Sequence, residues 1–68
     1  MKQVSGRELA RIVQQHGWQL ARIKGSHHIF TKSGARERLV IPIHGNTSLK
    51  IGLLRSQMKL AGLTEADL

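Results

Sequence analysis

The chain has 68 residues, no cysteine, and eleven Lys and Arg against four Asp and Glu, which gives a net charge of +7. Its length suits one small domain over residues 1–68, and the lack of cysteine excludes disulfides and zinc–thiolate sites. No apolar run reaches the ~20 residues of a membrane span or marks a signal peptide, so we expect a cytoplasmic protein. The basic charge favours an anionic partner: nucleic acid first, an acidic protein second and a membrane surface third.

The first predicted helix covers residues 6–16. Ser5 and Glu8 have the spacing of a capping box, in which the Ser5 hydroxyl accepts from the Glu8 amide and the Glu8 carboxylate reaches back to Ser5. Gly17 suits the position that follows a helix. The residues on one face have the i, i+3, i+4, i+7 spacing of an amphipathic helix: Leu9, Ile12, Val13 and His16.

A β-hairpin is predicted next, with strands at residues 18–24 and 28–32. The Gly25-Ser26 step between them favours a tight turn, because glycine tolerates a positive φ and serine can hydrogen-bond its own backbone. The apolar alternation of the first strand slips between Leu20 and Ile23, which indicates a β-bulge there.

A third strand at residues 38–43 and a second helix at residues 51–61 complete the main elements. Pro42 has no N–H group to donate, so the third strand belongs at an edge of the sheet. Gly62 followed by Leu63 is typical of a Schellman ending, and the residues after them start one further turn. The apolar residues that share one face of the third strand are Leu39, Ile41 and Ile43.

The predicted order, α-β-β-β-α, indicates an α+β fold. Two amphipathic helices would cover one face of a three-stranded antiparallel sheet, which is the layout of the double-stranded RNA-binding domain. Such domains recognise RNA by its shape, through phosphates and 2′-hydroxyls. The residues that we expect to be mostly buried are Trp18, Leu20, Ile41, Leu54 and Met58.

His27, beside the hairpin turn, is the candidate catalytic residue. Histidine can take and return a proton at cellular pH. If the bound RNA is also the substrate, its own 2′-hydroxyl can be the nucleophile, and the reaction needs a base, a cation near the phosphorane and an acid for the leaving 5′-oxygen. Lys24 could supply the cation, whereas His28, His44 and water are all candidates for the second proton transfer. The competing interpretation is that His27 is an ordinary surface residue at a strand end.

We expect no metal and no cofactor. Adjacent strand residues point to opposite faces, so His27 and His28 cannot easily bind one ion, and no carboxylate lies near the histidines in sequence. Arg55 and Lys59 share an exposed helix face, where RNA contact and a merely solvated charged face are equally good interpretations. The residues that we expect to contact RNA are Lys24, Gly25, Ser26, Lys50, Arg55 and Lys59.

The chain also resembles the HicA toxin family, small mRNA interferases of bacterial toxin–antitoxin pairs. The resemblance covers nearly the whole chain and depends on five pieces in this order: Gly17-Trp18, the run from Arg22 to His27, Val40-Ile41-Pro42 with His44, Ile51-Gly52-Leu53-Leu54, and Ala61-Gly62-Leu63. It implies a fold like that of the double-stranded RNA-binding domain and a ribonuclease activity that arrests translation. It also implies that the active-site histidine is His27 and that an antitoxin, HicB, covers it.

We therefore expect a metal-independent endoribonuclease toxin that cleaves mRNA. It would be a monomer when free and would form a hetero-oligomeric complex with a HicB-type antitoxin. Two other classes of function remain as alternatives. One is a non-catalytic RNA-binding module in which His27 only contacts RNA, and the other is a protein-interaction domain whose basic face docks an acidic partner.

Overall fold

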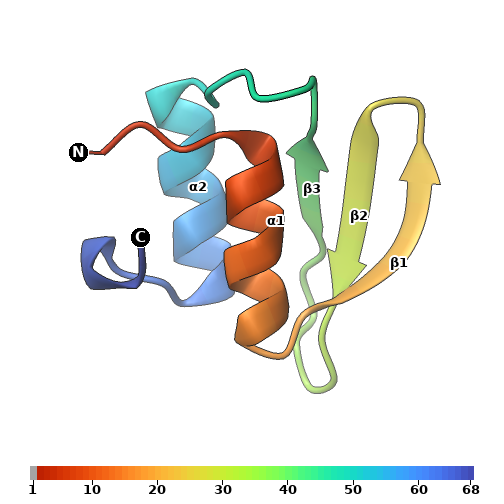
Figure 1. Cartoon of the computed structure of the whole chain (residues 1–68). Coiled ribbons are helices and arrows are strands. Elements are labelled where there is room, and N and C mark those ends of the chain that lie inside the picture. Colours follow the sequence, from red (N-terminus) through yellow and green to blue (C-terminus); the bar gives the residue numbers. More distant parts are fainter. Residues whose placement is uncertain (1) are drawn as a thin grey trace.

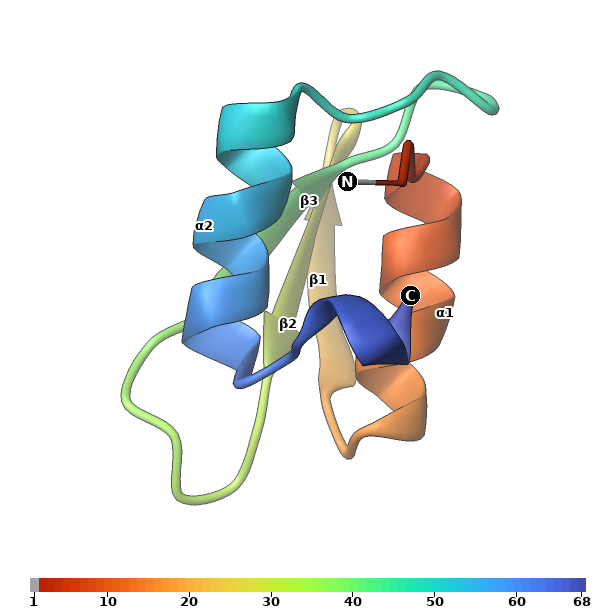
Figure 2. The same ribbon diagram turned by 90° about the vertical axis from the view of Figure 1, so that its left-hand side faces the viewer.

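Two helices pack on one face of a three-stranded antiparallel sheet (Figures 1 and 2). The structure, a computed structural model, describes residues 2–68. The elements are α1 (Gly6–Gln15), β1 (Gln19–Lys24), β2 (His27–Thr31), β3 (Leu39–Pro42), α2 (Ile51–Ala61) and a short 3-10 helix, η1 (Glu65–Asp67). The strands are ordered β1-β2-β3. The α+β class, the α-β-β-β-α order and the likeness to the double-stranded RNA-binding domain are thus confirmed.

α1 begins with half of the predicted capping box. The Ser5 hydroxyl accepts a hydrogen bond from the Glu8 amide at 3.1 Å. The Glu8 carboxylate does not reach back to Ser5, because it accepts from Nε of Arg11 at 3.1 Å and from the same guanidinium through a second contact. The hydrogen bond from Arg11 lowers the pKa of Glu8 and raises the pKa of Arg11. The reciprocal part of the predicted cap was therefore wrong.

The end of α1 is a Schellman motif. Gly17 adopts a φ of 93°, which lets the Trp18 amide donate to the Val13 carbonyl at 3.1 Å. α1 thus ends at Gln15, one residue before the predicted end, and His16 is its C-cap. His16 is exposed rather than part of the buried stripe, and its Nε2 lies 3.4 Å from a carboxylate oxygen of Asp67.

The core lies between the two helices and the inner face of β2 and β3. Its fully buried side chains come from all four of these elements: Leu9, Val13, Phe30, Leu39, Ile41 and Leu54. The predicted burial of Trp18 and Met58 is confirmed as well. Leu20 contradicts the prediction, because 43% of its surface is exposed. The helices cover β3, whereas β1 lies at the opposite edge of the sheet, farthest from them (Figure 1).

The sheet contains the predicted bulge and the predicted edge. Leu20 pairs with Phe30 and Arg22 pairs with Ile29, so one extra residue of β1 lies between the two pairs. β3, which ends at Pro42, is an edge strand as expected. β2 begins at His27, one residue earlier than predicted, so His27 belongs to the ladder itself.

Candidate functional site

His27 and Lys24 lie on the face of the sheet that carries no helix. Phe30 points into the core, and successive residues of a strand point to opposite faces, so His27 points away from the helices. In the ladder, His27 lies directly opposite Lys24 on one side and Pro42 on the other. Opposed residues of antiparallel strands share a face, so Lys24, His27 and Pro42 form one row across the open face.

His28 lies on the other face of β2, against the helix side. It is half-buried opposite Ile41, and its Nδ1 lies 3.2 Å from the Ser26 carbonyl. The Ile43 amide donates to the same carbonyl at 2.9 Å. Gly25 adopts a φ of 59°, which glycine tolerates without strain. The hairpin turn is therefore hydrogen-bonded to the chain just after β3, and His27 and His28 point to opposite faces of the sheet.

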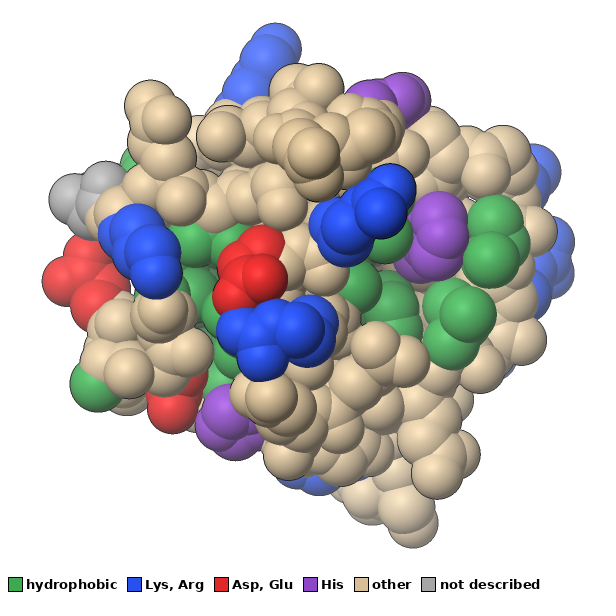
Figure 3. Space-filling view, viewed as in Figure 1, with side chains coloured by type: hydrophobic (Ala, Val, Ile, Leu, Met, Phe, Trp, Pro, Cys, Tyr) green, Lys and Arg blue, Asp and Glu red, His purple; other side chains and the backbone are tan. Residues whose placement is uncertain are grey.

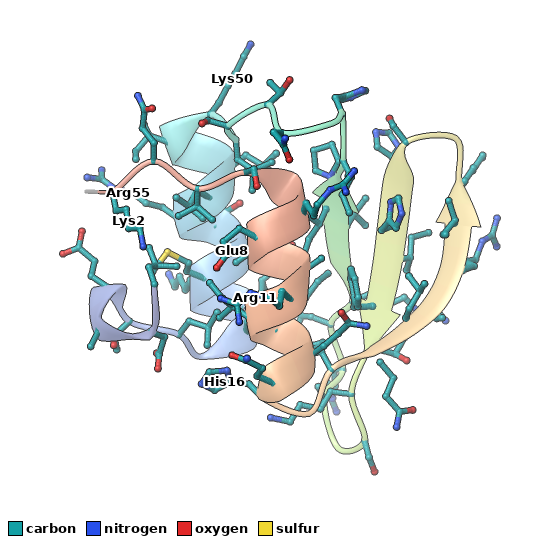
Figure 4. All side chains as sticks on the ribbon, in the orientation of Figure 1. Lys2, Glu8, Arg11, His16, Lys50 and Arg55 are labelled. Carbon is teal, nitrogen blue, oxygen red and sulfur yellow. The ribbon has the colours of Figure 1, made fainter. Side chains whose placement is uncertain are left out.

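Lys50 lies at the same end of the molecule as the hairpin turn. It is the N-cap of α2 and makes no side-chain capping bond. Both ribbon views place the β1–β2 turn, the loop after β3 and the start of α2 at this end (Figures 1 and 2), and Lys50 extends outward there (Figure 4). We call this region the hairpin end; it comprises residues 24–28 and 43–50.

Arg55 and Lys59 lie away from the hairpin end. Both are exposed, and Figure 4 shows Arg55 on the side of α2 that faces away from the sheet. Lys59 is eight residues after Ile51, which corresponds to about 12 Å along the helix axis. The six residues predicted to contact RNA thus separate into Lys24, Gly25, Ser26 and Lys50 at the hairpin end, and Arg55 and Lys59 along α2.

The hairpin end is basic and contains no carboxylate. Its residues include Lys24, His27, His28, His44 and Lys50 but no Asp or Glu. Within residues 2–68, the ion pairs join Arg11 to Glu8 and His16 to Asp67, so neither pair neutralises Lys24 or Lys50. This distribution favours a polyanion as the ligand of the hairpin end.

A pocket adjoins the row that contains His27. It lies between the end of β3 and the start of α2 and has a volume of about 240 Å³. Its lining residues are Pro42, His44, Thr47, Ser48, Leu49, Lys50 and Leu53. Sequence reasoning missed this pocket, because it is built from a strand, a loop and a helix, and no spacing along the chain reveals that they meet.

A second, more open pocket lies at the opposite end, beside the loop after β2. Trp18, Lys32 and Lys59 are among its lining residues. The Lys32 ammonium lies 6.0 Å from the centroid of the Trp18 ring, at the limit of a cation–π contact. Trp18 Nε1 is buried and has no hydrogen-bond partner within residues 2–68.

β1 exposes hydrophobic side chains on the helix side of the sheet. Leu20 and Ile23 are 43% and 55% exposed. Figure 3 shows exposed hydrophobic side chains at the right of the molecule, where Figure 1 draws β1, with a histidine next to them. Ile23 pairs with His28 in the ladder, so this apolar strip borders the hairpin end.

Two further properties concern the described part of the chain, residues 2–68. No three His, Cys, Asp or Glu side chains come together there as a metal site would require. None of its helices combines the length and the hydrophobicity needed to cross a bilayer.

Comparison with known proteins identifies the family. The family model described as HicA toxin of bacterial toxin-antitoxin matches residues 6–63, which include both helices, all three strands and the whole hairpin end. No match was found among curated proteins. A match over this share of a 68-residue chain means that the protein belongs to the HicA family and is the toxin of a toxin–antitoxin system, with an antitoxin as the kind of partner that this implies.

Proposed function

We propose that this toxin is a metal-independent endoribonuclease that cleaves mRNA and thereby inhibits translation in the cytoplasm. The observation that carries the proposal is the pairing of Lys24 with His27 on the open face of the sheet. A proton-transfer group and a cation are thus neighbours beside an exposed turn. The surrounding hairpin end has positive charge and no carboxylate, which suits an RNA substrate.

The chemistry follows from this arrangement. His27 takes the proton of the RNA 2′-hydroxyl, whose oxygen attacks the adjacent phosphorus. The Lys24 ammonium stabilises the charge that develops on the phosphorane. The bond to the 5′-oxygen then breaks, which leaves a 2′,3′-cyclic phosphate on one fragment and a 5′-hydroxyl on the other.

The proton for the leaving 5′-oxygen has three candidate sources. His28 is disfavoured, because it lies on the opposite face from His27 and its Nδ1 is beside the Ser26 carbonyl. His44 is exposed and lies two residues beyond Pro42, the cross-strand neighbour of His27. His44 or water is therefore the better assignment.

The partner that we propose is a HicB-type antitoxin that covers the row of His27. An acidic antitoxin surface would match the positive charge of the hairpin end and would speed association. Occlusion of His27 explains how one partner could silence the nuclease without unfolding it. A complex that leaves His27 open to solvent would contradict direct occlusion.

Replacing His27 tests the catalytic proposal. His27→Ala should lower the rate of RNA cleavage on the order of 10²–10⁴-fold, the usual contribution of a positioned proton-transfer group. Fold and RNA affinity should persist, because His27 is exposed and is not part of the core. Cleavage by the parent should continue in EDTA and yield the cyclic phosphate, measured by mass spectrometry of the fragments.

His28→Asn is the matched control, since it retains a side chain that can donate to the Ser26 carbonyl and lies on the other face. It should cost much less activity than His27→Ala. If folded His27→Ala protein cuts RNA as fast as the parent, His27 is not catalytic. The protein is then better explained as an RNA-binding module.

A further inference from the structure

Among the residues that line the pocket beside Pro42, only His44 is a candidate in the proposed reaction. Pro42, Leu49 and Leu53 give it apolar walls, and hydroxyl, imidazole and ammonium groups lie among its other lining residues. We propose that it binds the base of one unpaired nucleotide next to the phosphate that His27 attacks, an inference that rests on the proposed nuclease function. The protein would thus select single-stranded RNA, although its fold is one that elsewhere recognises duplexes by shape.

The position of the pocket is the first argument. Pro42 both lines the pocket and lies directly opposite His27 in the ladder. Side chains opposed in this way have Cβ atoms about 4.5–5.5 Å apart. An RNA strand whose phosphate lies at His27 therefore passes over Pro42, and the neighbouring nucleotide lies at the mouth of the pocket.

The size of the pocket is the second argument. Its volume of about 240 Å³ lies below the ~300–1,000 Å³ of sites for drug-sized ligands. A single nucleobase is smaller than such ligands and has two apolar faces with a polar edge. A base-paired nucleotide cannot enter, because its edge is occupied by its partner and its faces by the stack.

The polar groups complete the match with a nucleotide. The Thr47 and Ser48 hydroxyls can donate to and accept from the edge of a base. Lys50 supplies a cation for the phosphate of the same nucleotide. Residues 43–50 contain no Asp or Glu that would repel that phosphate.

The experiment is a double-mutant cycle between the pocket and the base. On the protein side, Thr47→Trp fills the pocket with a side chain that starts from an exposed position. On the RNA side, an abasic nucleotide removes the base, and it is placed at each position of a short single-stranded RNA in turn. Affinities are measured with His27→Ala protein and with RNA that carries 2′-O-methyl groups in place of its 2′-hydroxyls. This RNA has no nucleophile of its own and stays intact whether or not His27 is catalytic. At one RNA position, each change alone should weaken binding on the order of tenfold, and the two together should weaken it no further.

Ser33→Trp is the control, because it adds the same side chain to an exposed loop outside the pocket and should leave the affinity unchanged. A second measurement guards against misfolding of Thr47→Trp. In protein with Thr47 intact, the methyl resonances of Leu49 and Leu53 should shift with normal RNA and shift less with the abasic RNA.

Three results would overturn the inference. The first is that the affinity losses from Thr47→Trp and from the abasic nucleotide add at every RNA position, and the second is that the fully paired duplex of the same sequence binds with equal affinity. The third is that the methyl resonances shift equally with normal and abasic RNA. If Thr47→Trp weakens antitoxin binding but not RNA binding, the pocket belongs to the protein interface. Failure of the nuclease proposal would show separately, as unchanged cleavage by His27→Ala.

Discussion

Gly6, the first residue of α1, lies directly against the backbone at the end of β3. A Cβ atom at Gly6 would overlap the carbonyl oxygen of Pro42 and lie 3.3 Å from Cα of Ile43. Both neighbours are backbone atoms, so neither can rotate away. Gly6→Ala should lower the free energy of unfolding by about 1–3 kcal/mol, as overpacked cores do, measured by the midpoint of urea unfolding.

Gly52 provides the opposite case within α2. Nothing lies within 4 Å of a Cβ built there, and the position is exposed. Gly52→Ala should raise the free energy of unfolding by up to about 1 kcal/mol, because alanine has the higher helix propensity. If Gly6→Ala left the free energy of unfolding unchanged or raised it, as Gly52→Ala should, the close contact at Gly6 would be wrong.

Single residues also show which positions around the candidate site can be predicted from the sequence and which cannot. His27 is beside the turn as expected, because the glycine and serine that make a turn are adjacent in sequence. The same two-residue turn also predicts that Lys24 lies directly opposite His27. Pro42 was predicted only as an edge residue, since its place between His27 and the pocket depends on the pairing of distant segments.

One carboxylate caps η1, so the stability of this short helix should depend on pH. Oδ2 of Asp67 accepts from the Thr64 amide at 2.8 Å, and this bond is the main cause that holds the pKa of Asp67 below its ordinary value. The stabilising effect is complete above the unfolded-state pKa of about 3.9 and is lost as the pH falls through the lower folded-state pKa. The Thr64 amide resonance should titrate with this lower pKa in an NMR pH series.

Asp67→Asn is the control for this titration. Its amide oxygen can still accept from Thr64, but it carries no ionisable group, so the Thr64 resonance should no longer titrate in the acid range. An Asp67 carboxyl that titrates at or above the ordinary aspartate pKa would contradict the hydrogen-bonding arrangement.

The elements differ in how far the sequence predicts them. α2 is predicted to the residue, because the signals of its end are local: an apolar run stops at Gly62, and Leu63 donates back to Met58 at 2.9 Å. The exposure of Leu20 is not predictable in this way. It depends on which strand the helices cover, and the alternation within β1 is the same whether or not a helix lies above it.

For the whole molecule, the net charge of +7 predicts RNA binding that weakens with salt. The structure adds that the cations are not equivalent. Lys50→Ala should weaken binding of a short single-stranded RNA and reduce the slope of log K against log salt by about 0.7, the value for one lost phosphate contact. Lys59→Ala should change neither quantity, because Lys59 lies toward the opposite end of α2.

Longer RNA makes this comparison sharper. A strand long enough to pass from the hairpin end along α2 can reach Lys59 as well, so Lys59→Ala should then reduce the salt slope too. Fluorescence anisotropy with RNAs of two lengths would measure both effects. Equal losses from the two substitutions on the short RNA would contradict a site centred on the hairpin end.

The outer edge of β1 bears on how the free toxin behaves in solution. An edge strand leaves a row of backbone donors and acceptors on which another chain could stack and begin an aggregate. Arg22 and Lys24 put like charges on this strand, and the bulge between Leu20 and Arg22 interrupts its regular hydrogen-bonding repeat. Both features oppose stacking between copies, so a molecule released from its antitoxin is expected to stay dispersed rather than aggregate.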